Sequence, residues 1–256
     1  MINIVTLFIW FVIYSFLGWV WETTFCSIRA GHFINRGFLN GPVIPVYGFG
    51  AVFVMLAMSF FRSSAIPTHL PYVDIPLVFF GGLVICTLLE YVTAVILESA
   101  FHIRWWDYSK QKFNFQGRIC LKSALFFGLM SVVIIYIVQP LVSNVTVSIP
   151  ADIANPLALV FLVLFAVDLA VTLSSLLHLK SHLAHVQHRI EHAAEEFKDN
   201  AEDFREDVFA AFSRSKRQIQ RLAKAFPDSV ARHHDEAWQK IKEHAGIVGN
   251  QNIQGI

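Results

Sequence analysis

The sequence predicts an all-α polytopic membrane protein, with five transmembrane helices arranged as two hairpins plus one, followed by a C-terminal cytoplasmic helical arm. The chain of 256 residues is 55% apolar and only 15% charged, which is too apolar for an ordinary soluble domain. It contains five apolar stretches, each close to the ~20 residues that a helix needs to cross the hydrocarbon core. Beyond them the chain becomes rich in charged residues.

The five predicted spans make up one transmembrane domain, residues 1–177. Their approximate bounds are Ile2–Phe25, Val43–Phe61, Pro76–Leu97, Ile119–Val142 and Pro156–Leu177. The first stretch lacks the basic start and the small-residue cleavage site of a secretory signal, so we expect it to remain as a helix.

Loop charges predict the orientation. The loop after the first span carries Arg29 and Arg36, and the loop after the third is basic from Arg104 to Arg118. In the loops on the other side, the only Lys or Arg is Arg62, at the edge of the second span. Because cytoplasmic loops are enriched in Lys and Arg, we expect a multi-pass protein of the cell membrane, with its N-terminus outside and its C-terminus in the cytoplasm.

The segment after the last span has the pattern of a cytoplasmic amphipathic helical arm, residues 178–245, with a flexible tail at 246–256. Apolar residues recur every seven positions, with a second row four positions on: Ile190, Phe197, Phe204 and Ala211, then Ala194, Ala201 and Val208. Pro227 should end this helix, and a shorter one is expected over about Asp228–Ala245. The spacing suits a coiled coil, so we expect the arm to form a homodimer or to fold on a partner.

A short phrase occurs at the inner ends of both hairpins. Glu22 to Arg29 closes the first span, and the similar run from Glu98 to Arg104 closes the third. The two hairpins would have the same topology, so an internal duplication would give a parallel repeat; chance similarity is the alternative.

Ionisable residues at these inner ends are the main functional candidates, because charges beside lipid are costly and usually mark function. In the first span, Ser15, Gly18 and Glu22 share a helix face suited to packing on a neighbour. Glu90 lies about two turns, or ~12 Å, deeper than Glu98, so it needs a positive partner, a hydrogen-bonded cage or a proton. The candidate cavity-lining residues are Glu22, Arg36, Asn40, Tyr47, Glu90, Glu98, Arg104, Trp105, Trp106, Asp107, Asn114 and Arg118.

We expect Glu22, Glu90, Glu98 and an arginine, from Arg36 or Arg118, to line one cavity facing the cytoplasm. The alternative is that these charges form buried pairs that fix helix register. The loop around Trp105 and Trp106 is either an interfacial anchor or a partly re-entrant segment whose aromatic rings wall a pocket.

Glycine and proline surround the predicted start of the second span, from Asn35 to Gly50. This composition is typical of an interrupted helix start, whose free backbone groups can line a cavity.

No metal site is expected. The histidines His178, His182, His185, His188 and His192 fit a polar helix that leaves the membrane better than a metal site, because no carboxylate or cysteine lies among them before Glu191. The three cysteines form no CxxC pair and are expected to be reduced thiols.

Several motifs, in order, resemble the bacterial membrane family catalogued as putative ABC-transporter type IV. The matching runs are Tyr14–Glu22, Asn35–Pro42, Pro45–Gly50, Leu89–Tyr91, Arg104–Ser109 and Phe113–Cys120. The resemblance covers roughly residues 5–140 and leaves out the fifth span and the arm. It implies an integral membrane protein of permease type.

Three classes of function fit these features. The first is a transporter component with a polar cavity open to the cytoplasm; no Gly-x-x-x-x-Gly-Lys-[Ser/Thr] run occurs, so a separate ATP-binding subunit would supply any ATP hydrolysis. The second is an intramembrane enzyme or lipid-headgroup-binding protein, and the third is a non-catalytic scaffold or sensor. No metal or nucleophile motif assigns a catalytic residue or a cofactor, so enzymatic activity is left open. The net charge of +1 argues against a nucleic-acid partner.

Overall fold

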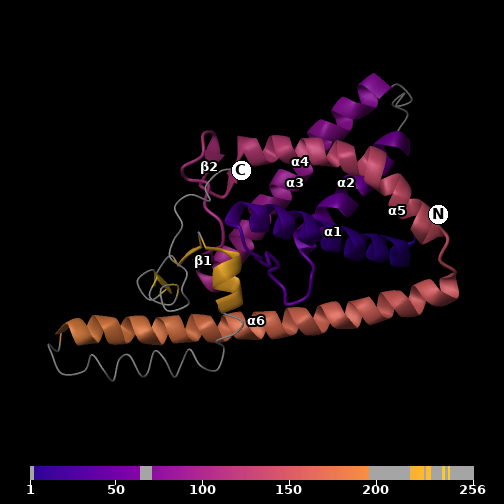
Figure 1. Ribbon diagram of the computed structural model, residues 1–256. Helices are drawn as coiled ribbons and strands as arrows, with labels where there is room; N and C mark the ends of the chain where they lie inside the picture. The colour runs from indigo at the N-terminus through magenta and orange to yellow at the C-terminus, as the bar shows by residue number, and fades with distance from the viewer. Residues whose placement is uncertain are drawn as a thin grey trace.

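The computed structural model describes residues 3–63, 71–195, 220–227, 229–231, 238–239 and 242. In these residues the chain is mostly helical, and helices α1 to α5 form a bundle that lies against the long helix α6 (Figure 1). The helices are α1 (Ile4–Ala30), α2 (Pro45–Ser63), α3 (Pro71–Phe101), α4 (Leu121–Val133), the π-helix η1 (Ile134–Val138), α5 (Gln139–Val147) and α6 (Ala151–Glu195). The two-residue strands are β1 (Ile103–Arg104), β2 (Asn114–Phe115), β3 (Ile119–Cys120) and β4 (Val230–Ala231).

Four helical stretches are long and apolar enough to cross a membrane: Ile4–Ala30, Asp74–Phe101, Leu121–Val147 and Ala151–Leu177. They overlap the first, third, fourth and fifth predicted spans, and they indicate a multi-pass membrane protein. The second predicted span corresponds to α2, whose apolar part, Pro45–Phe61, is shorter than the other four. The count of five spans therefore stays a prediction.

The fourth predicted span is one continuous helix that changes its winding at the π-helix η1. The backbone N–H of Gln139 donates to the carbonyl of Ile134, five residues earlier. Pro140 follows directly, and its ring would clash with the carbonyl of residue 136 in a regular α-helix. The wider π turn separates these two groups, so this single proline explains the change.

Small residues let the helices of each hairpin approach closely. A Cβ at Gly18 in α1 would overlap the ring of Tyr47 in α2, and a Cβ at Gly82 in α3 would overlap Ser131 in α4. Ser15 and Gly18 are buried. The predicted packing face of the first span is therefore confirmed at these two positions.

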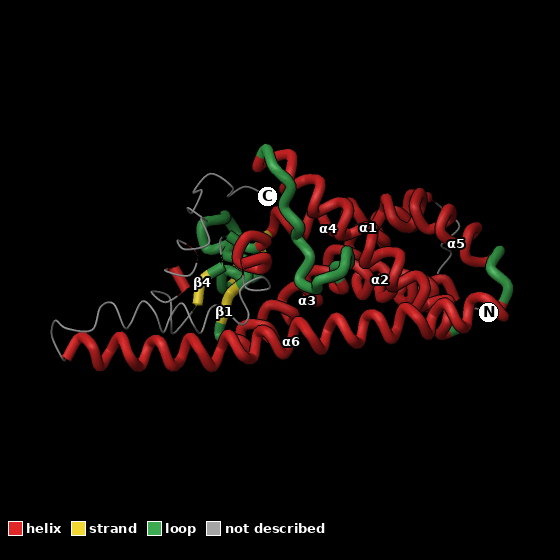
Figure 2. Tube along the Cα trace, turned by 60° about the horizontal axis from the view of Figure 1, so that its bottom comes forward, coloured by secondary structure: helices red, strands yellow, loops and turns green. Residues whose placement is uncertain are grey.

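Helix α6 lies along the whole bundle and continues beyond the end at which β1 lies (Figure 2). The predicted coiled-coil positions from Phe197 onward lie outside the described residues. Residues 220–225 form a short helical segment. Together with Phe226 it packs against Trp105 and Leu176 in a buried apolar cluster.

The shorter helix expected from about Asp228 does not begin there, because residues 230–231 are a strand. These residues form β4, which pairs antiparallel with β1 in the register Ile103↔Ala231 and Arg104↔Val230. The exposed edge of β1 supplies backbone hydrogen bonds, and a chain segment held against such an edge becomes a strand. The sequence pattern of residues 228–245 does not reveal this distant partner.

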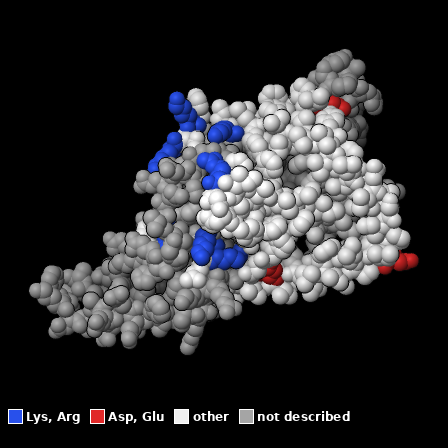
Figure 3. Space-filling view, viewed as in Figure 1, with Lys and Arg blue, Asp and Glu red and all other residues white. Residues whose placement is uncertain are grey.

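Basic side chains gather at the end of the bundle where β1 and β2 lie (Figure 3). The same end carries the loops at residues 31–44 and 102–120. This asymmetry agrees with the loop charges from which the orientation is predicted. The sidedness itself stays a prediction.

Candidate functional site

The first part of the site forms because the loop of residues 31–44 returns along α1. Ser27 Oγ accepts a hydrogen bond from the backbone N–H of Ile34 at 2.9 Å, and Asn35 Oδ1 accepts one from Trp19 Nε1 at 2.7 Å. The loop ends where the N–H of Ile44 donates to the carbonyl of Ser15 at 2.9 Å. The returning loop thereby runs beside the helix turn that carries Glu22.

Arg36 in this loop forms an ion pair with Glu22 of α1. Arg36 Nη2 and Nε lie 3.1 and 3.2 Å from Glu22 Oε1, and both side chains are partly exposed. Tyr47 of α2 is also hydrogen-bonded to Glu22. Burial opposes the charge on Arg36, but the Glu22 carboxylate, with smaller contributions from Cys26 and Tyr47, outweighs it, so the pKa of Arg36 is raised. The arginine therefore stays charged at every physiological pH.

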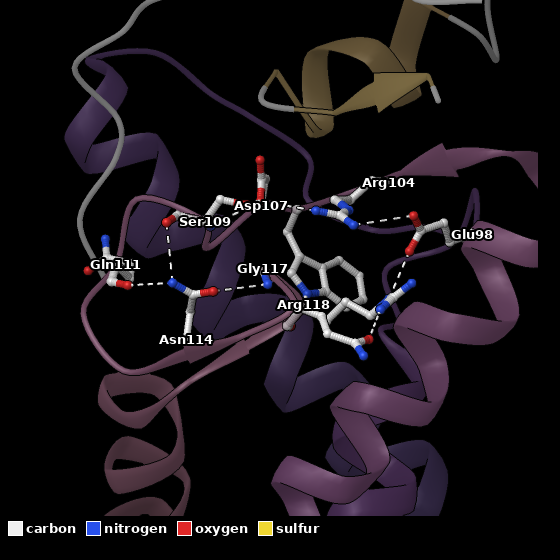
Figure 4. Close-up of polar contacts among 10 residues, drawn as sticks. Glu98, Arg104, Asp107, Ser109, Gln111, Asn114, Gly117 and Arg118 are labelled. Carbon is white, nitrogen blue, oxygen red and sulfur yellow. Dashed lines mark hydrogen bonds and ion pairs between the residues drawn. The ribbon is translucent and has the colours of Figure 1, made fainter. Parts of the chain in front are cut away.

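The second part of the site holds Glu98 of α3 between two arginines of the following loop (Figure 4). Arg118 Nε lies 2.8 Å from Glu98 Oε2, and Arg104 Nη2 lies 3.4 Å from Oε1. Glu98 is only 5% exposed. A carboxylate this deeply buried needs such partners, because an unpaired charge there would be strongly destabilising.

The loop that carries these arginines is shaped by its own polar side chains. Asp107 Oδ1 accepts hydrogen bonds from the N–H and Oγ of Ser109, at 3.0 and 2.5 Å, and lies 3.4 Å from Arg104 Nη1. Asn114 Nδ2 donates to the carbonyl of Gln111 at 2.7 Å, and Asn114 Oδ1 accepts from the N–H of Gly117 at 3.1 Å (Figure 4). Asp107 and Asn114 thus hold the loop that positions the arginines.

The two tryptophans of this loop have different surroundings. Trp106 Nε1 donates to the carbonyl of Arg118 at 3.0 Å. Trp105 is 3% exposed, and its ring makes edge contacts with Phe38 and Phe226, at centroid distances of 5.6 and 5.3 Å. Trp105 therefore belongs to the apolar cluster between the loops and the C-terminal segment.

Glu90 has hydroxyl partners. Tyr108 Oη lies 3.2 Å from Glu90 Oε1, and Ser123 Oγ of α4 lies 3.4 Å from Oε2. The expected arginines are engaged elsewhere, Arg36 with Glu22 and Arg118 with Glu98. Of the three alternatives that the depth of Glu90 leaves open, the structure provides hydroxyl hydrogen-bond partners and no arginine contact among the described residues.

Tyr108 connects this cage to the first hairpin. Burial raises the pKa of the Tyr108 phenol, and the Glu90 carboxylate raises it further, with a smaller effect from Glu22. The phenol is therefore neutral and acts as a hydrogen-bond donor to Glu90. Glu22 also lies near enough to influence Glu90 electrostatically. Polar groups of the two hairpins are thus close enough to influence one another electrostatically.

Asp168 of α6 is not among the candidates, yet it binds the loop that begins α2. Its carboxylate accepts hydrogen bonds from the backbone N–H of Asn40 at 2.8 Å, from Asn40 Nδ2 at 2.9 Å, and from the N–H of Gly41 at 2.7 Å. Asp168 is the single ionisable residue in the last apolar stretch. The reasoning that identifies Glu90 from sequence, the cost of a charge beside lipid, applies equally to Asp168.

The C-terminal segment holds the same loop from another direction. Arg221 donates to the carbonyls of Gly37 and Leu39, each at 2.7 Å, and to that of Phe38 at 2.9 Å. Arg36 in turn donates to the carbonyl of Ala225. Nothing in the sequence points to these contacts, because they join residues more than 180 positions apart.

Chemically, the site consists of ion-paired carboxylates and arginines together with hydroxyl groups. Among the described residues, no group of three His, Cys, Asp or Glu side chains is placed to hold a metal ion. The side chains of the histidine run lie outside the described residues. The described thiols Cys26, Cys86 and Cys120 are free cysteines.

Comparison with known protein families identifies the family of the chain. A family profile described as Putative ABC-transporter type IV matches residues 9–173, which extends past the motif resemblance at 5–140 and takes in most of the fifth predicted span. Neither the curated proteins nor the solved structures gave a match. The apolar helices and the family fit a component of a membrane transporter. The chain belongs to the Putative ABC-transporter type IV family.

Proposed function

We propose that this chain is the membrane-embedded permease component of a transporter and that its substrate passes the polar residues at the inner end of the bundle. One observation supports this most directly: each buried or partly buried carboxylate at the inner ends of α1 and α3 forms an ion pair or a hydrogen bond with a residue of a loop. Glu22 is held by Arg36, Glu98 by the loop arginines, and Glu90 by Tyr108. Movement of the two loops would uncover all three carboxylates together.

The energetics of such pairs suit a gate. A buried ion pair gains little net stability, because its Coulomb attraction is offset by the desolvation of both charges. A charged or polar substrate that replaces one partner therefore exchanges one set of contacts for another. Loss of a partner without replacement costs about 3–5 kcal/mol, which keeps the empty site closed.

In this proposal, α2 completes a set of five spans, with the N-terminus outside and the C-terminus in the cytoplasm. The concentration of basic side chains around β1 and β2 supports this orientation. The energy would come from a separate ATP-binding subunit, in keeping with the family. A homodimer, held by the arm, would double the number of spans around the pathway.

The native Cys120 provides a test, since its Sγ lies 3.6 Å from Ser123 Oγ beside Glu90 and is buried. A variant that keeps only Cys120, with Cys26→Ala and Cys86→Ala, would be treated with a membrane-impermeant maleimide in inside-out and right-side-out vesicles. We expect slow labelling from the cytoplasmic face only. Arg118→Gln, which removes one partner of Glu98, should accelerate the labelling several-fold.

The matched control keeps Cys86 as the only cysteine. Cys86 lies in the middle of α3 against Gly50 and should stay unlabelled on both sides. The proposal fails if Cys120 is unreactive in both vesicle types while the denatured protein labels fully. Labelling from the outer face alone would overturn the orientation.

A further inference from the structure

The β2–β3 hairpin combines exposed aromatic rings with unpaired positive charge. Phe113 is 80% exposed and Phe115 is 55% exposed. Lys110, Lys112 and Lys122, which flank them, are also exposed. Among the described residues, none of these three lysines forms an ion pair. Scattered exposed apolar residues are ordinary, but large exposed rings and lysines gathered around one short hairpin are characteristic of a surface that binds something.

The backbone at the base of the hairpin, just before β2, is held in a strained conformation that presents one of these rings. Phe113 has φ +54°, which is rare for a bulky residue without a functional reason. The conformation is secured because the carbonyl of Phe113 accepts a hydrogen bond from the N–H of Leu121 at 3.1 Å. Attraction of basic loops to the cytoplasm explains the lysines, but it does not explain an exposed phenylalanine fixed in this way.

The hairpin packs against helix α3, and this position indicates what the exposed rings contact. The ring of Phe115 lies 5.7 Å from that of Tyr91 in α3, and Tyr91 Oη donates to Gln116 Oε1 at 3.1 Å. Tyr91 precedes the end of α3 by ten residues, or ~15 Å of helix. The hairpin therefore folds back along the inner part of a helix that is long and apolar enough to cross a membrane.

The apolar part of the hairpin also continues into a lipid-facing row. Leu121 begins α4, and Leu125 and Leu129 follow at intervals of four on the same helix face, all three exposed. In a membrane this row faces lipid. A surface continuous with it is bounded by acyl chains on one side and by headgroups on the other.

We propose that the β2–β3 hairpin is a binding site for anionic lipid, with Phe113 and Phe115 in the acyl boundary and the three lysines on the headgroup phosphates. Lysines close to an anionic leaflet are attracted to it, and aromatic rings beside them anchor at the interface. The one acidic side chain of the preceding loop, Asp107, is occupied by Arg104 and Ser109, so it does not neutralise the lysines. The inference requires no transport activity.

A fluorescent probe on the hairpin tests the proposal. Phe113→Cys, in full-length protein with the native cysteines replaced, would be labelled with an NBD maleimide. The protein would be reconstituted into vesicles of phosphatidylcholine, with or without about 30% phosphatidylglycerol. We expect blue-shifted emission and quenching by doxyl-labelled lipid, both severalfold stronger when phosphatidylglycerol is present. Replacing all three lysines with glutamine should abolish the dependence on phosphatidylglycerol.

The matched control carries the probe at Phe33→Cys, a similarly exposed ring position in the other loop at the same end. It has no lysine beside it and only one exposed arginine nearby, Arg29, so its response to phosphatidylglycerol should be weaker and should not change when the three lysines are replaced. If the probe at 113 is instead quenched by aqueous iodide in both vesicle types, this part of the hairpin lies in water and suits a soluble partner such as an ATP-binding subunit, which would overturn the proposal. Equal lipid quenching with and without phosphatidylglycerol, unaffected by the lysine substitutions, would overturn anionic recognition.

Discussion

Asp168→Asn should loosen the loop that leads into α2. In the wild-type protein, one carboxylate oxygen accepts from both nitrogens of Asn40 and the other accepts from the N–H of Gly41 at 2.7 Å. Asparagine keeps one acceptor, but its NH₂ group would face the N–H of Gly41. Two donors would then oppose each other across the shortest of the three hydrogen bonds.

The size of the effect follows from the hydrogen bond that the substitution removes. A hydrogen bond to a charged group contributes about 1.5–3 kcal/mol, and the partial exposure of Asp168 places the loss near the lower value, about 2 kcal/mol. In soluble proteins of similar length, 1 kcal/mol corresponds to about 2–4 °C in Tm, so the variant should melt about 4–8 °C lower.

The assay is thermal unfolding of the purified protein in one detergent, followed by intrinsic tryptophan fluorescence. The control is Asp152→Asn, which makes the same change in the exposed first turn of the same helix. Asp152 interacts with the helix dipole, so its loss should cost less than about 1 kcal/mol. If Asp168→Asn melts no lower than Asp152→Asn, the carboxylate does not hold the loop and the reasoning is refuted.

Three further predictions concern other contacts of the site. Glu98→Gln should lower Tm well beyond Glu22→Gln, because the first removes the charge of a carboxylate only 5% exposed that pairs with both Arg118 and Arg104, at up to about 3–5 kcal/mol, whereas the second breaks a partly exposed pair; equal shifts would contradict this. Arg221→Gln removes three hydrogen bonds to loop carbonyls and should speed protease release of a C-terminal tag several-fold; an unchanged rate would argue against docking. Because its pKa is raised, Tyr108 keeps its proton in the folded state above about pH 10, where an ordinary tyrosine loses it, so its stabilising contribution is present below that pH and is lost as pH rises further. At about pH 10, native wild type and Tyr108→Phe should therefore show the same phenolate absorbance in the near ultraviolet, and only the denatured proteins should differ.

The sequence predicts the helices well where their signal is local. Apolar length and composition locate, within about five residues, four stretches that the structure has as helices long enough to cross a membrane, and the glycine at position 18 indicates a close helix contact that the structure confirms. Element ends are less well predicted. The helix of the fifth stretch begins at Ala151, ahead of the expected Pro156.

The candidate site is found through the cost of placing charge beside lipid, which is also readable from sequence. This cost marks Glu22, Glu90 and Glu98, and the structure provides polar partners for all three. It does not identify the partners. The sequence favours an arginine for Glu90, but two hydroxyl groups are what the fold places beside it.

The sequence by itself therefore determined the membrane class, the approximate spans, the basic end of the bundle and the family motifs, because each depends on residues close together in the chain. Only the tertiary structure decided which charge meets which. Asn40 meets Asp168 across 128 positions, and Arg36 meets Ala225 across 189. Such contacts arise when helices pack and loops return over them. Their energies depend on geometry and burial that no local pattern records.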